Sequence, residues 1–402
     1  SVLGGFKRGF NVVPENVLTM AQHMHQAGYQ TAVFTPNPNA GKMSGLQREV
    51  DLHQEVWADD ASFRRRESSR YLHDAFWSWR EAYPGEPYWV HFQTIDPGVS
   101  LAAAAPFGGL FVGPERVKWL DEASERLREE GGAGIYSEAF EKTGISRPAF
   151  YSISQGFYDE RMAHNDYQIG RLVERLKAEG EWENTLLIIA ADHGIDAVLT
   201  DMALAVQDSL PPPWNETIML RPSITRVPLL FVWPGHIEGG QRFSQPVVSM
   251  IDALPTILDL VGLPLPEVMQ GQSLAPLLLG EGGVEPRPVI LDEFLVDGKG
   301  ELSGFIEVVD GRWGASLEIN PNPDRPPEQQ RPVPLLLYDL WNDPMCLHPV
   351  HEEHPDLVAK YTAFLEAQFE AHLALGQLFT PSEPVPLTPE QLEMLRALGY
   401  IR

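Results

Sequence analysis

The sequence predicts an α/β protein with a mostly parallel central sheet flanked by helices, followed by a smaller C-terminal α+β domain. Along the first two-thirds of the chain, apolar residues at helical spacing alternate with short apolar runs, which is typical of parallel strands joined by crossover helices. The 34 glycines and 35 prolines among 402 residues suit many strand-to-helix turns. From about residue 286 the pattern changes to short strands and turns.

Two helix-and-strand units are predicted within the first hundred residues. Apolar residues over 18–27 fall at helical spacing, and Gly28 can end that helix. Residues 31–34 then predict a strand, because this stretch contains β-branched and aromatic side chains. A charged helix over 64–79 and a strand over 88–93 form the second unit.

The best-defined unit lies in the middle of the chain. The preceding segment, 101–148, has weak periodicity, so we expect it to cover the main body as an insertion. An apolar face over 162–176 predicts a helix, and the apolar run 186–191 predicts a buried strand. That strand leads directly into Asp192 and His193. Ligands of open α/β sheets bind beyond the carboxyl ends of parallel strands, so the pair is well placed for chemistry.

Further elements complete two predicted domains. A strand over 227–233 and a helix over 251–261 belong to the first domain, residues 1–285. Short strands and a helix over 354–373 make up the second domain, residues 286–402.

Composition excludes several kinds of protein. The chain has 30 basic and 56 acidic residues, a formal net charge of −26, which repels polyanions and argues against nucleic acid or an anionic membrane as partner. No run approaches the roughly 20 apolar residues of a membrane span. The single cysteine, Cys346, excludes an intramolecular disulfide framework and a thiolate zinc cluster.

Three residues are candidates for chemistry on residue type and position alone. Asp192 and His193 offer a carboxylate and an imidazole at the end of a strand, and a hard divalent cation accepts such donors. The alternative is that Asp192 caps the next helix and His193 packs against the sheet. His91, on a predicted strand, is either catalytic or a core histidine.

Several ordered motifs cover most of the chain. They lie at residues 158–160, 166, 169–172, 184–186, 192–194, 226–230, 233–235, 249–260, 262, 270–274 and 337–344. In this order they resemble the sulfatase family of the alkaline-phosphatase superfamily. The resemblance implies an alkaline-phosphatase-like fold and the hydrolysis of a sulfate monoester carried by a small molecule or a carbohydrate.

The resemblance also implies a metal-dependent site. A divalent cation is expected, calcium in the first place, with Mg²⁺ or Mn²⁺ as alternatives. Asp192 would be an anionic ligand, and His193 a neutral ligand or a donor to the sulfate. The family's nucleophile is a formylglycine formed in a Cys/Ser-x-Pro-x-Arg motif, which follows a strand that ends in paired metal-binding aspartates.

That nucleophile motif does not occur among the 402 residues. The first residues, Ser1 to Gly5, resemble the family's segment directly after the motif, so we expect a fragment that lacks the nucleophile segment and is inactive by itself. An export signal would also lie in that segment, which leaves the compartment open between cytoplasm and periplasm for a soluble protein.

Other positions depart from the family pattern. Residues 35–39 replace a Gly-Lys-Trp-His segment, which makes Asn37 and Asn39 candidate substrate-binding residues. Residues 96–98 replace Asp-Pro-His, and Arg221 is a candidate substitute for a lost cation. Two alternatives follow: a phosphodiesterase or phosphonate monoester hydrolase of the same superfamily, and a catalytically inactive sulfatase-like binding protein.

Overall fold

The structure is a computed structural model, and it describes residues 12–37, 40–41, 44–46, 48–55, 68–97, 103, 105–130, 138–194, 222–296, 302–320, 334–346, 348–380, 388–389 and 392. The chain divides into two compact units. One contains Arg8–Ala178, and the other contains Glu179–Gly194 and Val206–Thr380. The boundary predicted at residue 286 falls inside the second of these units.

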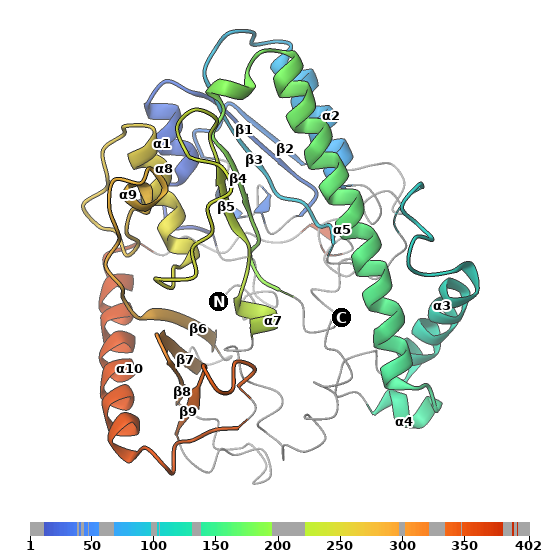
Figure 1. Ribbon diagram of the computed structural model, residues 1–402, viewed down its shortest axis with the longest axis vertical. Coiled ribbons are helices and arrows are strands. Elements are labelled where there is room, and N and C mark those ends of the chain that lie inside the picture. The colour runs from blue at the N-terminus through green and yellow to red at the C-terminus, as the bar shows by residue number, and fades with distance from the viewer. Residues whose placement is uncertain are drawn as a thin grey trace. The chain divides into compact units, whose positions relative to one another are not determined.

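A three-stranded parallel sheet forms the centre of the Arg8–Ala178 unit (Figure 1). Its strands are β1 (Gln30–Thr35), β2 (Leu52–Glu55) and β3 (Tyr88–Phe92), in the order β2-β1-β3. Both neighbours pair in parallel with β1, as the sequence predicts for this part of the chain. The sequence analysis does not predict β2, whose four residues include a single apolar one, Leu52.

Helices surround this sheet. Helix α1 (Met20–Gln26) begins at a capping box, in which the side chains of Thr19 and Gln22 each bond the other residue's backbone N–H. Helix α2 (Ser68–Arg80) covers one sheet face, where Phe76 meets the ring of Phe92 edge to face. The described part of the predicted helix over 64–79 is therefore confirmed.

The weakly periodic segment before residue 148 forms two helices with a core of their own. They are α3 (Pro114–Glu129) and α4 (Ala139–Thr143), which pack on the first half of α5 (Arg147–Ala178). Helix α5 is 32 residues long, and its later turns run alongside α2 (Figure 1). It begins earlier than predicted because Phe150 and Phe157 face the insertion's core and not the sheet.

The second unit begins with β4 (Leu187–Ala190), which pairs antiparallel with β5 (Leu229–Val232). The sequence analysis predicts both strands, but the parallel arrangement that it predicts for them is wrong. A short apolar run has the same pattern whichever way the strand points, so the sequence alone did not determine the direction. The described residues between these strands contain one helix, the four-residue α7 (Pro222–Thr225).

Short helices and an antiparallel sheet complete this unit. The helices are η5 (Trp182–Asn184), η7 (Met250–Asp252), α8 (Ala253–Leu260) and α9 (Ala275–Leu278). The sheet runs β6 (Val289–Val296), β7 (Leu302–Asp310), β8 (Trp313–Ile319) and β9 (Leu335–Asp339) in chain order. Helix α10 (Pro355–Gly376) packs on one face, where Tyr361 and Leu365 are buried against Ile306 and Leu337. This part matches the predicted C-terminal α+β character.

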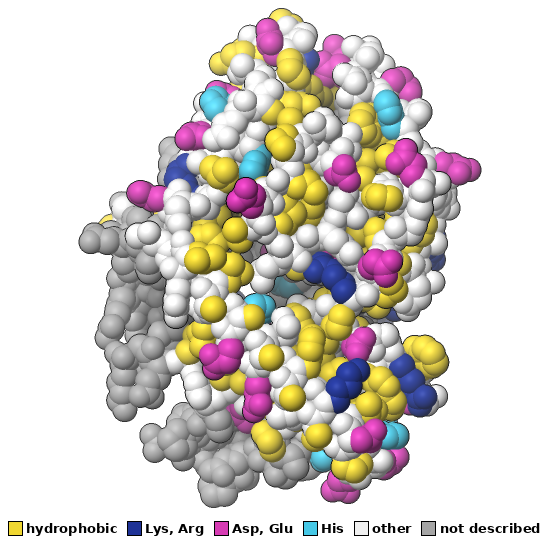
Figure 2. Space-filling model, turned by 90° about the vertical axis from the view of Figure 1, so that its left-hand side faces the viewer, with side chains coloured by type: hydrophobic (Ala, Val, Ile, Leu, Met, Phe, Trp, Pro, Cys, Tyr) yellow, Lys and Arg dark blue, Asp and Glu magenta, His cyan; other side chains and the backbone are white. Residues whose placement is uncertain are grey.

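Acidic side chains are spread over the face drawn in Figure 2, where basic ones are fewer. None of the described helices is long and apolar enough to cross a membrane.

Candidate functional site

Asp192 and His193 lie at the end of β4, as predicted, with exposed side chains. Asp192 Oδ1 accepts a hydrogen bond from the His193 backbone N–H at 2.9 Å. His193 Nδ1 lies 2.6 Å from the Gly194 carbonyl oxygen. Because a carbonyl oxygen only accepts, the proton must sit on Nδ1, and a neutral imidazole then carries its lone pair on Nε2.

Each side chain keeps one further atom that no local hydrogen bond occupies and that could donate an electron pair to a metal. Asp192 Oδ2 and His193 Nε2 are 3.9 Å apart. Two ligands at right angles around one calcium-sized ion lie about 3.4 Å apart, so the spacing fits two positions on a single divalent cation. The turn is held in place by the Gly194 N–H, which donates to the Ile224 carbonyl oxygen of α7 at 2.7 Å.

The pair by itself is an incomplete metal site. A calcium ion takes six to eight oxygen ligands, and other protein metal sites use three or four side chains. Across the described ranges, no group of three or more His, Cys, Asp or Glu side chains comes together in a way that could hold a metal. The chemistry of the two donors therefore fits part of a cation site.

His91 lies on β3 in the other unit. Val33 of β1 pairs with His91 on one side and with His53 of β2 on the other, so the two imidazoles share a sheet face. The His91 ring stacks on Trp89. Desolvation lowers the pKa of His91, a hydrogen bond with the Gln93 side chain opposes this shift, and His53 adds to the lowering. His53 was missed because β2 itself was not predicted.

Asn37 follows the carboxyl end of β1 and is buried. Its backbone N–H donates to Thr35 Oγ1 at 2.9 Å, and that hydroxyl lies 3.3 Å from the Asn37 carbonyl oxygen, which it can bond. This local turn fixes the backbone where the strand ends. The other two candidates, Asn39 and Arg221, lie outside the described residues.

The loop after β3 is fixed by a buried carboxylate that the sequence analysis did not single out for this role. Asp96 Oδ2 accepts hydrogen bonds from Ser68 Oγ at 2.7 Å and from the Ser69 N–H at 3.2 Å, at the start of α2. Asp96 Oδ1 lies 4.0 Å from the guanidinium of Arg161 on α5, and neither side chain is exposed. The loop is thus tied to two helices.

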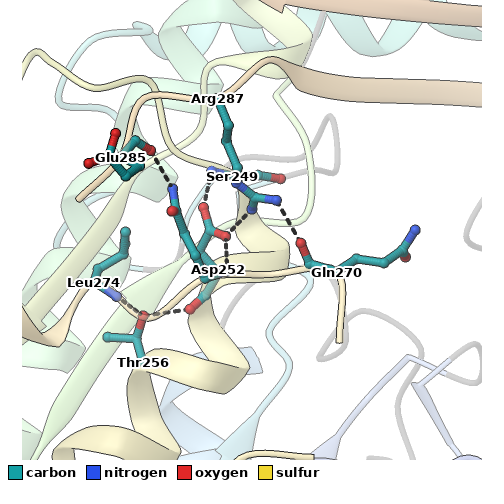
Figure 3. A network of polar contacts seen from close by, with 8 residues as sticks. Ser249, Asp252, Thr256, Gln270, Leu274, Glu285 and Arg287 are labelled. Carbon is teal, nitrogen blue, oxygen red and sulfur yellow. Dashed lines mark hydrogen bonds and ion pairs between the residues drawn. The ribbon is translucent and has the colours of Figure 1, made fainter. Parts of the chain in front are cut away.

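A second buried carboxylate, Asp252, lies in the unit that contains β4 and β5 (Figure 3). It connects η7 to the segment that leads into β6. One oxygen accepts the Ser249 N–H at 2.9 Å, and the other accepts the Gln272 N–H at 2.8 Å and pairs with Arg287. At Gly271 the chain passes so close that an added Cβ would lie 2.1 Å from the Ile251 carbonyl oxygen. The network joins segments that are 35 residues apart in sequence.

Solved structures show the class of fold to which this arrangement belongs. The chain is similar to the phosphonate monoester hydrolase from Silicibacter pomeroyi, with a TM-score of 0.62 and 18% identity over 97% of this chain and 88% of that one. A 2-O GAG sulfatase gives a TM-score of 0.61 and 18% identity, over 95% and 83%. The architecture is therefore an α/β fold of the alkaline-phosphatase-like type that sulfatases share.

The sequence comparisons are more specific. Residues 138–263, which include Asp192 and His193, match the family model named Sulfatase. Human arylsulfatase A is 29% identical over 239 residues, 55% of this chain and 45% of the relative. Endo-4-O-sulfatase of Bacteroides thetaiotaomicron is 29% identical over 203 residues, 48% and 36%. The matched segments span less than half of these relatives, and over these segments the chain is similar to sulfatases.

Proposed function

We propose that this chain forms part of a metal-dependent hydrolase of sulfate monoesters, in which Asp192 and His193 bind the cation. One observation carries the proposal: Asp192 Oδ2 and His193 Nε2 lie 3.9 Å apart, while the other polar atom of each side chain is held by a local hydrogen bond. The family match over residues 138–263 supports the same reading. The substrate is a sulfate ester of a small molecule or a carbohydrate.

The two side chains have different tasks in this proposal. Asp192 supplies negative charge, and His193 supplies a neutral nitrogen whose orientation is fixed by the Gly194 carbonyl. When bound, a divalent cation would polarise a sulfate oxygen as a Lewis acid. Calcium is the proposed ion, with magnesium or manganese as alternatives that accept the same donors.

Cation binding can be measured without turnover. We expect Mn²⁺ titrated into the full 402-residue chain, and followed by electron paramagnetic resonance, to bind at least about tenfold more weakly to Asp192→Asn and His193→Ala than to the parent. Ca²⁺ should compete with Mn²⁺ for the same site. Glu238→Gln removes an exposed carboxylate of the same unit and is the matched control. Equal affinity in all four proteins would refute the assignment of the pair.

The second expectation concerns turnover. None of the 402 residues stands in a Cys/Ser-x-Pro-x-Arg motif, so we propose that this chain by itself releases no sulfate from 4-nitrophenyl sulfate. Sulfate release above the rate of the Asp192→Asn variant would contradict this mechanism. Reading the coding sequence upstream of Ser1 for that motif and an aspartate pair tests the same point independently.

Parallel assays separate the alternatives. A phosphodiesterase or phosphonate monoester hydrolase would turn over bis-4-nitrophenyl phosphate or a phenylphosphonate ester in preference to the sulfate. An inactive binding protein would bind the cation normally and turn over none of them, even with an intact nucleophile segment upstream.

A further inference from the structure

The turn that follows β9 carries Trp341, which at 72% is the most exposed large apolar side chain of the described residues. Its backbone N–H donates to Asp339 Oδ1 at 3.2 Å, and the N–H of Asn342 donates to the Asp339 carbonyl oxygen at 3.1 Å. The Leu340 N–H donates to the carbonyl oxygen of Arg312, which precedes β8, at 2.8 Å. The backbone that carries the exposed indole is therefore held in place on both sides.

A guanidinium lies against one face of the Trp341 ring. Arg312 Nε donates to Asp339 Oδ1 at 2.9 Å and Arg312 Nη2 donates to Oδ2 at 2.5 Å, a two-pronged pair that fixes the guanidinium plane. Arg312 Cζ lies 5.8 Å from the ring centroid of Trp341 and 4.8 Å from that of Trp313. Because Arg312 covers one face of Trp341, the opposite face is the one that is open to water.

Polar atoms beside this ring remain able to form hydrogen bonds. The Arg312 side chain is 41% exposed, and within the described part of the chain its Nη1 donates to no acceptor. Asn342 is exposed, and its Nδ2 donates to Asp339 Oδ2 at 2.6 Å, so its Oδ1 can accept a further bond. The surface thus combines a flat apolar face with a donor and an acceptor.

The charges around this surface restrict what can bind to it. The Asp339 carboxylate compensates the Arg312 cation. The Trp313 ring contacts the His354 ring, with centroids 5.0 Å apart, and His354 follows two exposed glutamates, residues 352 and 353. The whole chain has a formal net charge of −26. A polyanion would be repelled here, which favours an uncharged partner.

We infer that Trp341, Arg312 and Asn342 bind one ring of a neutral saccharide whose ring substituents are all equatorial, as in β-linked glucose. The axial positions of such a ring carry only C–H hydrogens, which the electron-rich face of an indole attracts. Its equatorial hydroxyl groups both donate and accept, so they match Arg312 Nη1 and Asn342 Oδ1. A purely aromatic ligand would cover these polar atoms without replacing the water that they lose.

This inference does not rest on the proposed function. It involves neither Asp192 nor a sulfate group, and all the residues that carry it lie within the Val206–Thr380 part of one unit. The ligand is bound and not hydrolysed at this surface.

Isothermal titration of the full 402-residue chain with cellohexaose, a neutral oligosaccharide of β-linked glucose, tests the assignment. We expect Trp341→Ala to weaken cellohexaose binding by at least about tenfold, and Trp341→Phe to weaken it less because a smaller aromatic face remains. Phe243→Ala removes another exposed aromatic side chain of the same unit, 43% exposed, and should bind cellohexaose like the parent. Equal melting temperatures verify that these exposed changes leave each variant folded.

Several results would overturn the inference. One is the absence of cellohexaose binding to the parent, and another is equal affinity in the parent and Trp341→Ala. Displacement of cellohexaose by heparin, a sulfated polysaccharide, would contradict a neutral ligand. If sedimentation velocity showed that Trp341→Ala converts a dimer into a monomer, a second copy of the chain and not a saccharide would cover the ring.

The Asp192→Asn variant separates this surface from the cation site. It should bind cellohexaose like the parent, and a loss of saccharide binding in it would contradict the assignment to Trp341. Cellohexaose binding that depends on Trp341, together with absent Mn²⁺ binding, would reject the proposed function alone.

Discussion

Replacing Asp252 with alanine is expected to lower the free energy of unfolding of its unit by about 2–3 kcal/mol, because it removes a buried carboxylate that accepts two backbone N–H groups and pairs with a partly exposed guanidinium. The Asp252 side chain is not exposed, and it pairs with Arg287 while accepting the N–H groups of Ser249 and Gln272. In the alanine variant, the Arg287 guanidinium and the two backbone N–H groups would lose the carboxylate that they now contact. Urea unfolding monitored by tryptophan fluorescence, with Trp233 in the same unit, measures the loss.

Asp356→Ala is the control for this experiment. Asp356 is an exposed carboxylate in the first turn of α10, so its removal should cost at most about 1 kcal/mol through the helix dipole. If Asp252→Ala were no more destabilising than Asp356→Ala, the network in Figure 3 would not contribute to stability as argued.

The stability of the sheet-containing Arg8–Ala178 unit is expected to fall as the pH is lowered from about 6.5 towards 4. Burial lowers the pKa of His73 on α2 to about 4, against a hydrogen bond with the Gln168 backbone that raises it, and nearby Arg171 and His164 add to the lowering. The folded state therefore keeps this imidazole neutral, while the unfolded chain takes up a proton near pH 6.5. Below that pH, protonation stabilises the unfolded state relative to the folded state. The free energy of unfolding therefore falls by about 3 kcal/mol in total by the time the pH is below 4.

His73→Phe removes the titrating group and keeps a ring against Phe92, which His73 contacts edge to face. Unfolding free energies measured between pH 7.5 and 4 should fall less steeply in the variant than in the parent, by about 1 kcal/mol per pH unit at most. His164 and Arg171, the charged or titratable groups that act on His73, remain in both proteins. Equal slopes in parent and variant would show that His73 is not kept neutral by the fold.

Regular apolar patterns predicted much of the fold. Strands β1, β3, β4 and β5 are runs of branched and aromatic residues, and such runs form strands wherever both faces are covered. Strand β2 has the sequence Leu-His-Gln-Glu and is held in the sheet by its pairing with β1, a contact that no local pattern indicates. The direction of β5 also depends on pairing between segments about 40 residues apart.

The candidate site was predictable in its residues and not in its geometry. Asp192 and His193 are adjacent in the chain, and the end of a strand was visible in the sequence. Which oxygen and which nitrogen remain available is decided by bonds to the backbone of residues 193 and 194, and a sequence does not show them. The contacts of Glu160, which the sequence analysis places only in a motif, and those of Arg161 were not predicted, because their partners lie about 50 and 65 residues away along the chain.

Glu160 and Arg161 are neighbours on α5 and hold two separate segments of the chain: Glu160 accepts backbone N–H groups from the turn that ends at Val112, and Arg161 contacts Asp96. This arrangement affects where the sequence of such a protein can change in length. The loop at Asp96 and the turn at Val112 are each fastened to α5 independently, so the position of the turn is set by the helix and not by the length of the connection before it. Insertions or deletions between these two anchors would be tolerated more readily than changes at the anchors themselves. Variation in that connection would then change the length of chain before Val112, while the turn that Glu160 holds stays in register with α5.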